Sequence, residues 1–77
     1  MSLIEMYTRP GCGYCAGARQ LLSDQGLDFV DLDVYTDPKH KLDMNRRTSN
    51  KTYPQIFIDG ESIGGYEELL KLQRKAS

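Results

Sequence analysis

The residues best suited to chemistry are two cysteines in the run Cys12-Gly13-Tyr14-Cys15. Their spacing at i and i+3, where an apolar strand pattern gives way to a helical one, indicates a redox motif. At a helix start, free backbone N–H groups and the positive end of the helix dipole favour a thiolate at Cys12, and Arg9 adds a positive charge nearby. We expect Cys15, one turn inside, to be more buried, less ionised and placed to attack a mixed disulfide formed at Cys12.

Three other roles for the two cysteines compete with this interpretation. A structural disulfide across so short a loop would remove little entropy from the unfolded chain. A zinc site normally needs four N or S ligands, and the chain offers only Cys12, Cys15 and His40. Two unreactive core cysteines fit poorly with the surrounding Pro, Gly and Tyr residues, which suit an exposed loop. Redox chemistry is therefore preferred, and His40 is interpreted as a solvated residue on a polar helix.

Two further segments contain groups that a peptide-like ligand would use. Thr52-Tyr53-Pro54 comes directly before an apolar strand, although proline cannot donate to a sheet. The Tyr53–Pro54 bond is either cis, which would present the backbone N–H and C=O of Tyr53 to an extended peptide, or trans at a plain strand start. Gly64-Gly65 precedes a helix whose free N–H groups would hold a carboxylate, unless the pair is only a turn.

Hydrophobic periodicity and turn residues define the elements that must position these groups. Strands are expected over residues 3–8, 27–34, 55–58 and 61–63, and helices over 12–25, 38–48 and 66–75. Asp37 before Pro38 marks a helix start, Gly26 a helix end, and Asp59-Gly60 a hairpin turn. The order βαβαββα, which begins with a parallel right-handed βαβ unit, predicts an α/β fold with a four-stranded mixed sheet and three helices.

Some details of the expected helices rest on weaker signals. The segment 38–48 is mostly polar, and Leu42 and Met44 are its only clear apolar contacts. Within it, Asp43 and Arg47 are four residues apart and can pair weakly. Gly17 lies inside the first helix, where it costs ~1 kcal/mol relative to Ala, and no sequence neighbour explains it. A basic run is interpreted as a solvated face, with a surface that steers anions as the alternative; its members are Lys39, Lys41, Arg46, Arg47 and Lys51.

Size and composition limit the classes of protein. The 77 residues predict one domain, 1–77, with no separate substrate domain. The apolar share of 39% and charged share of 27% argue against disorder. A net charge of -1 gives no nucleic-acid footprint, and no apolar run approaches the ~20 residues of a membrane span. With no secretory signal at the N-terminus, we expect a cytoplasmic protein, where structural disulfides are rare.

Three segments, in order and in spacing, resemble those of the glutaredoxin family. They are Tyr7–Cys15, which resembles the active-site signature, Thr52–Gly60, which resembles the cis-proline segment, and Ile63–Leu69, which resembles the glycine-glycine segment. The resemblance implies a thioredoxin-like fold and a monomer that reduces protein disulfides and glutathione mixed disulfides. It also implies that Cys12 is the nucleophile and Cys15 the resolving thiol.

The same resemblance implies glutathione as the electron-donating co-substrate. Arg9, where the family usually has Lys, would meet its glycine carboxylate, and the backbone of Tyr53 would pair with its cysteinyl part. The helix start at Tyr66 and Glu67 would hold its γ-glutamyl end, and Lys41 is a weaker candidate for a carboxylate contact. The full set of implied binding residues is Arg9, Tyr14, Thr52, Tyr53, Pro54, Gly65, Tyr66 and Glu67.

Departures from the family pattern keep two alternatives open. Gly13 stands where the family often has Pro, and some members with Gly resemble carriers in which two chains share a [2Fe-2S] cluster through the first cysteine and bound glutathione. Tyr53 replaces the usual Val, and Glu67-Glu68 replaces the usual Asp pair. The other alternative is a small redoxin that takes electrons from thioredoxin reductase and serves ribonucleotide reductase, against which the glutathione-like segment 64–68 argues.

Overall fold

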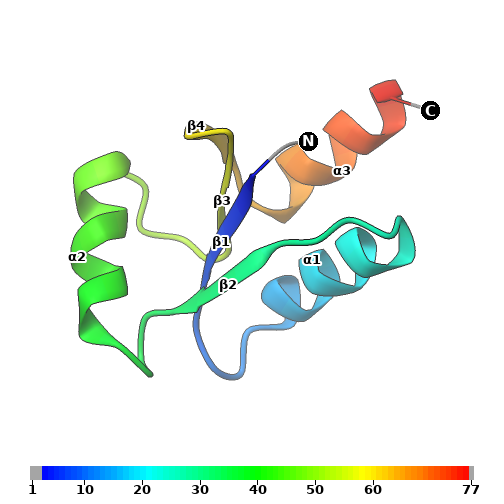
Figure 1. Cartoon of the computed structure of the whole chain (residues 1–77). Coiled ribbons are helices and arrows are strands. Elements are labelled where there is room, and N and C mark those ends of the chain that lie inside the picture. Colours follow the sequence, from blue (N-terminus) through cyan, green and yellow to red (C-terminus); the bar gives the residue numbers. More distant parts are fainter. Residues whose placement is uncertain (1–2, 77) are drawn as a thin grey trace.

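The structure is a computed structural model that describes residues 3–76, with side chains through Leu72. Its elements follow the predicted order βαβαββα (Figure 1). They are β1 (Ile4–Thr8), α1 (Gly13–Asp24), β2 (Val30–Asp33), α2 (Pro38–Arg47), β3 (Gln55–Ile58), β4 (Glu61–Gly64) and α3 (Tyr66–Ala76). The longest helix has 12 residues, and within the described part of the chain none could span a membrane.

The four strands form one mixed sheet in the order β2-β1-β3-β4. β1 pairs with β2 in parallel and with β3 antiparallel, and β3 pairs antiparallel with β4. The parallel pair is joined through α1, as the βαβ prediction required. The predicted fold class, a four-stranded mixed sheet with three helices, is confirmed.

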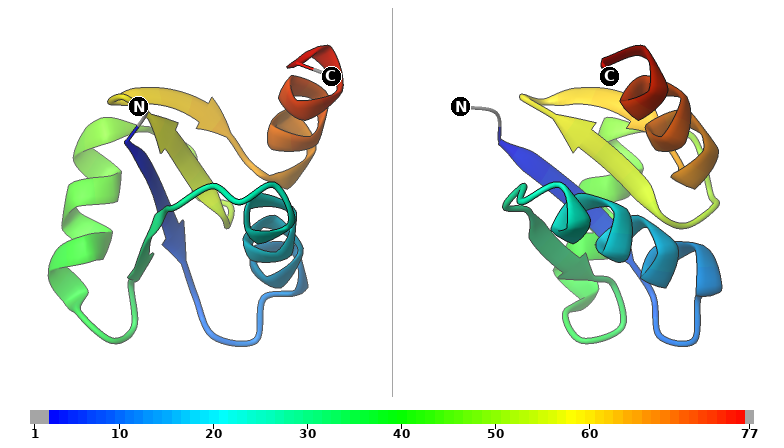
Figure 2. Two further views of the ribbon diagram at one scale, coloured as in Figure 1. Left: turned by 45° about the vertical axis from the view of Figure 1, so that its right-hand side comes forward. Right: turned by 90° about the vertical axis from the view of Figure 1, so that its right-hand side faces the viewer.

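Helices cover both faces of the sheet, α1 and α3 on one side and α2 on the other (Figures 1 and 2). Because side chains alternate along β1, its residues contribute to two separate cores. The core under α1 and α3 contains Ile4, Met6, Ala18, Leu22, Ile56 and Leu69. The core under α2 contains Tyr7, Val34, Met44 and Phe57. β1 is therefore fixed from both sides, and the loop that follows it starts from a rigid base.

The predicted turn and cap residues are confirmed. The side chain of Asp37 accepts a hydrogen bond from the N–H of Lys39 at 3.0 Å, and Pro38 begins α2. Gly26 has φ +68° and follows the end of α1. Asp59-Gly60 forms the β3–β4 turn with both φ values positive, as a tight hairpin requires.

The apolar contact expected of Leu42 is wrong, because 58% of this residue is exposed. Met44 alone among the residues of α2 is fully buried and joins the core beneath it. The helix therefore presents a narrower apolar face to the sheet than its sequence suggested.

Arg47 supplies the rest of the contact between α2 and the sheet. The expected pairing with Asp43 is replaced by an ion pair in which its two Nη atoms donate to Glu5 of β1 at 2.9 and 3.1 Å. A third bond reaches the Tyr7 hydroxyl at 3.0 Å, and the guanidinium lies 4.0 Å from the centre of the Phe57 ring. A cation stacked on an aromatic ring and paired with a carboxylate takes the place of an aliphatic contact.

Candidate active site

Cys12 caps the N-terminus of α1. Its backbone is extended, with φ −95° and ψ 111°, and its sulfur accepts a hydrogen bond from the N–H of Cys15 at 3.3 Å. The sulfur thus occupies the acceptor position that Ser or Asp takes at an ordinary helix start. Gly11, at φ +71°, turns the chain just before this point. The predicted placement of Cys12 at the helix N-terminus is confirmed.

The surroundings of Cys12 favour its thiolate. Burial, the largest single influence, raises the pKa of Cys12. Hydrogen bonds from the thiol and the backbone N–H of Cys15 oppose it, as do the positive charge of Arg9 and the N–H of Tyr14. The balance leaves the pKa of Cys12 below that of an ordinary cysteine. A larger share of Cys12 is therefore ionised and nucleophilic at neutral pH.

Cys15 has the opposite environment. It is completely buried, whereas Cys12 is partly exposed, and both are free thiols. Burial, followed by its hydrogen bond to Cys12, raises the pKa of Cys15 to about 11. The expectation that Cys15 is the more buried and less ionised partner agrees with this geometry.

The loop before β3 brings the backbone of Tyr53 close to Cys12. The Tyr53–Pro54 bond is cis, and the Tyr53 carbonyl oxygen lies 3.8 Å from the Cys12 sulfur, close enough to accept from its thiol. Gln55 holds this segment: its Nε2 donates to the carbonyl and hydroxyl oxygens of Thr52 at 2.7 and 3.0 Å. Gln55 was not among the residues predicted from the sequence. Its signal was that a polar residue occupies a position of the strand where the alternation of side chains predicts burial.

The glycine pair lets β4 end against the cis-proline segment. Gly64 has φ +113°, and a Cβ there would lie 2.8 Å from Cγ of Glu68. A Cβ on Gly65 would lie 3.3 Å from the Pro54 carbonyl oxygen. The positive φ of Gly64 favours glycine, and a side chain on Gly65 would crowd the backbone of the cis-proline segment.

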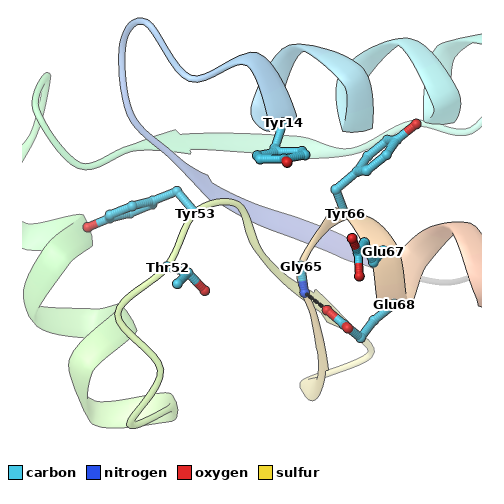
Figure 3. Close-up of a pocket in the computed structure, with 7 residues that line it drawn as sticks. All are labelled: Tyr14, Thr52, Tyr53, Gly65, Tyr66, Glu67 and Glu68. Atoms are coloured by element: carbon cyan, nitrogen blue, oxygen red, sulfur yellow. Dashed lines mark hydrogen bonds between the residues drawn. The ribbon is translucent and has the colours of Figure 1, made fainter.

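The start of α3 is capped from within. The Gly65 carbonyl accepts from the N–H of Leu69 at 3.1 Å, and the Gly65 N–H donates to the Glu68 carboxylate at 2.8 Å (Figure 3). This is half of a capping box, and its signal in the sequence, a Glu three residues after the cap, was overlooked. The N–H groups of Tyr66 and Glu67 lie in the first turn, where helical residues have no intrahelical acceptor.

These elements enclose a groove of about 250 Å³ (Figure 3). Its walls are Tyr14, Thr52, Tyr53, Gly65, Tyr66, Glu67 and Glu68. The Tyr53 ring points away from the other labelled residues, so Tyr53 offers mainly its backbone to the groove (Figure 3). Most of the sequence-predicted binding residues thus meet in one place. Arg9 and Pro54 lie outside the lining, and Glu68 is an addition.

An aromatic pair forms one wall of the groove. The rings of Tyr14, on α1, and Tyr66, on α3, are 6.1 Å apart and tilted by 37°. A Cβ on Gly17 would lie 3.1 Å from the Tyr66 ring. This contact explains the glycine inside α1: it leaves room for the ring of a residue far away in the sequence.

The remaining sequence candidates lie outside the lining of this groove. Arg9 is exposed, and its guanidinium lies 5.9 Å from the centre of the Tyr53 ring. His40 lies 4.0 Å from Asp37 at the start of α2, and Lys41 is exposed on the same helix. Within the described residues, no group of three or more His, Cys, Asp or Glu side chains is arranged to hold a metal ion.

Sequence comparisons connect this site with known proteins. The glutaredoxin family profile matches residues 4–63. Glutaredoxin 3 of Escherichia coli K12 is 37% identical over 75 residues, which cover 97% of this chain and 90% of that protein. A glutaredoxin of Neisseria meningitidis serogroup B is 36% identical over 76 residues, covering 97% of this chain and 89% of that protein.

Solved structures agree in fold. Glutaredoxin 1 of Francisella tularensis, in complex with cacodylate, superposes with a TM-score of 0.80 at 32% identity, covering 99% of this chain and 96% of its own. A buckwheat glutaredoxin–glutathione complex superposes with a TM-score of 0.86 at 20% identity, covering 97% of this chain and 71% of its own. The second comparison bears on the fold alone, which is thioredoxin-like.

Proposed function

The chain belongs to the glutaredoxin family of thiol–disulfide oxidoreductases, and we propose that it reduces glutathione mixed disulfides and protein disulfides with glutathione as electron donor. The observation that carries the proposal is the junction between Cys12 and the groove. The Cys12 thiol, whose pKa is lowered, lies 3.8 Å from the Tyr53 carbonyl oxygen. Tyr53 in turn lines a cavity whose other wall includes the first turn of α3, where N–H groups have no acceptor within the helix.

The first step is attack by the Cys12 thiolate on the glutathione sulfur of a glutathionylated protein. A disulfide forms between Cys12 and glutathione, the bond to the protein breaks, and the protein leaves as a thiolate that takes up a proton. A second glutathione thiolate then attacks the bound glutathione sulfur, which releases oxidised glutathione and restores Cys12. This route needs only one cysteine.

The second route uses Cys15 on protein disulfides. Cys12 opens the substrate disulfide, and Cys15 then attacks the Cys12 sulfur, so that the substrate leaves reduced and a Cys12–Cys15 disulfide remains. Two molecules of glutathione reduce that disulfide. Disulfide-bearing proteins, ribonucleotide reductase among them, are the proposed partners of a cytoplasmic monomer.

The groove and the neighbouring Arg9, which lies outside its lining, together offer complementary groups to each part of glutathione. Two helix N–H groups, of Tyr66 and Glu67, suit the γ-glutamyl carboxylate, and the Glu67 carboxylate suits the neighbouring amine. The backbone of Tyr53 suits the cysteinyl amide, and the Arg9 charge suits the glycine carboxylate. The Gly65 N–H already donates to Glu68. The buckwheat glutaredoxin, which shares the fold, was solved with glutathione.

The direct test is turnover of a glutathionylated substrate coupled to glutathione, glutathione reductase and NADPH. We expect robust turnover that saturates with the substrate. If the folded protein shows no turnover with glutathione but thioredoxin reductase reduces its disulfide, the glutathione proposal is wrong and the redoxin alternative replaces it.

A paired substitution tests the proposed orientation in the groove. Glu67→Gln removes the charge facing the amine and should raise KM for the glutathionylated substrate several-fold while kcat changes little. Glu61→Gln, at an exposed position of β4 outside the groove wall, is the matched control. Equal KM values for both variants would place the γ-glutamyl end elsewhere.

The alternative function, binding of a [2Fe-2S] cluster, requires accessible sulfur ligands. Cys15 is fully buried, and Cys12 is the partly exposed sulfur. With no three-residue ligand group among the described residues, one chain by itself does not fit a [2Fe-2S] cluster. Anaerobic reconstitution with iron, sulfide and glutathione tests the two-chain form, and a colourless monomer would exclude it.

A further inference from the structure

Three polar side chains, one each from β1, β2 and α1, are joined by hydrogen bonds. The hydroxyl of Thr8, at the end of β1, donates to one carboxylate oxygen of Asp31 on β2 at 2.5 Å. The Nε of Arg19, on α1, donates to the other oxygen at 2.5 Å. Thr8 is completely buried. The group therefore connects the last residue of β1, the edge strand and the helix that carries both cysteines.

The position of Arg19 relative to Cys15 is set by the helix. The two residues are four apart on α1, so they lie on the same face, one turn from each other. Asp31 fixes the guanidinium through Nε, and the Nη atoms donate to no acceptor among the described residues. A cation that would otherwise move freely in solvent is thereby kept on the Cys15 face of the helix.

We propose that Arg19, held by Asp31 and Thr8, is a positioning residue that stabilises the thiolate of Cys15 during the resolving step. Resolution requires a buried thiol to lose its proton, and a fixed positive charge one turn away lowers the cost of the resulting anion. The inference rests on the proposed redox use of Cys15 but not on glutathione as donor.

The charges around Cys15 agree with this role. Burial is the main cause of its raised pKa, and the hydrogen bond and charge of Cys12 raise it further. The backbone N–H of Arg9 and the charge of Arg19 act in the opposite direction. In the mixed disulfide Cys12 is no longer charged, so its repulsion disappears, while the attraction of Arg19, offset in part by the paired Asp31 carboxylate, remains.

The step can be followed with a neutral dipyridyl disulfide, which needs no glutathione. The Cys12 thiolate attacks one sulfur of the reagent, forming a mixed disulfide and releasing one thiopyridone. Cys15 then loses its proton to solvent and attacks the Cys12 sulfur, forming the Cys12–Cys15 disulfide and releasing a second thiopyridone. Two absorbance phases result, and only the second reports on Cys15.

Arg19→Gln should slow the second phase roughly three- to tenfold at neutral pH, as expected for loss of a partly screened charge about one helical turn away. The first phase should change less than twofold. The rate of the second phase should rise with pH in both proteins, and the variant should recover at higher pH. Arg19→Lys, which keeps the charge, should restore most of the rate.

Two controls define the result. Lys71→Gln makes the same change in net charge at an exposed position on α3 and should leave both phases unchanged. Cys15→Ser should abolish the second phase. An unchanged second phase in Arg19→Gln would overturn the proposal. So would equal slowing of both phases, which indicates a structural role, or failure of Arg19→Lys to restore the rate.

Discussion

Cys12 and Cys15 are three residues apart and chemically identical, yet the fold gives them opposite properties. Cys12 caps a helix, receives a backbone N–H and lies partly exposed beside the groove. Cys15 is one turn inside, fully buried, with its pKa raised to about 11. The difference arises from position on one helix: the N-cap residue Cys12 meets the positive end of the dipole, and Cys15, the third residue of α1, faces the interior. The proposed nucleophile and the proposed resolving thiol thus differ in both exposure and pKa.

The strongest test of this division is to remove each thiol in turn. Cys12→Ser should reduce turnover of a glutathionylated substrate to background, because no other surface thiol is available on the described chain. Cys15→Ser should keep most of that turnover but lose reduction of protein disulfides that require resolution. The NADPH-coupled assay measures both, with thermal unfolding to verify the fold. A Cys15→Ser variant as inactive as Cys12→Ser would contradict the division of labour.

The second test is the pH dependence of alkylation. A thiolate reacts and a thiol does not, so the rate for Cys12 should rise through its lowered pKa and level off at a lower pH than the rate for a free cysteine does. Cys15, protonated until pH approaches about 11, should stay unlabelled at neutral pH. Iodoacetamide labelling followed by peptide mass spectrometry separates the two residues. Labelling of both at neutral pH would mean that the helix start does not discriminate between them.

A smaller effect is expected from Arg9. Its charge contributes to the lowered pKa of Cys12, but the side chain is exposed and screened by solvent. Arg9→Met should therefore shift the alkylation profile to higher pH and reduce the rate on the rising limb by roughly two- to threefold. Arg9→Lys is the control and should behave as the wild type. If the alkylation profile of Arg9→Met moved all the way to that of a free cysteine, the lowered pKa of Cys12 would be due to Arg9 rather than to the helix.

The smallest effect should come from Gly13→Pro. Position 13 is the first of the helix, where Pro is favoured, and a Cβ there has no atom within 4 Å. The extended backbone of Cys12 suits a residue before proline. We expect a gain of about 0.4–1 kcal/mol in the free energy of unfolding, measured with denaturant.

The Cys12 pKa should hardly move in this variant, because the hydrogen bonds to its sulfur come from Tyr14 and Cys15 and not from residue 13. Gly13→Ala is the matched control and should gain less stability. A clear rise in the Cys12 pKa for the proline variant alone would show that the N–H of residue 13 also supports the thiolate.

The features that could be predicted from the sequence are those that depend on a few neighbouring residues. The helix start at Cys12, the Asp37 cap and the Asp59-Gly60 turn each depend on local backbone geometry, so their residue types identify them. The segments that form the groove could be identified from the sequence because each is short and the three occur in the order and spacing of the glutaredoxin family. The cis bond before Pro54 could be proposed but not decided, since the trans form fits the same residues.

What the sequence could not predict depends on residues that meet only after folding. Gly17 is explained by the ring of Tyr66, which arrives from the last helix. Arg47 pairs with Glu5 on β1 instead of with Asp43 on its own helix, because the sheet provides both the two carboxylate oxygens of Glu5 and the ring face of Phe57. Periodicity gave no signal for these pairs, since each partner alone resembles an ordinary surface or spacer residue.

The paired rings of Tyr14 and Tyr66 also give the protein an intrinsic optical reporter. The chain has no tryptophan and five tyrosines, so its ultraviolet emission comes from tyrosine alone. Two of those emitters form one wall of the groove, whereas Tyr7 is buried beneath α2. A ligand that enters the groove should reduce the solvent contact of the emitting pair. We therefore expect the tyrosine fluorescence of the unlabelled protein to report occupancy.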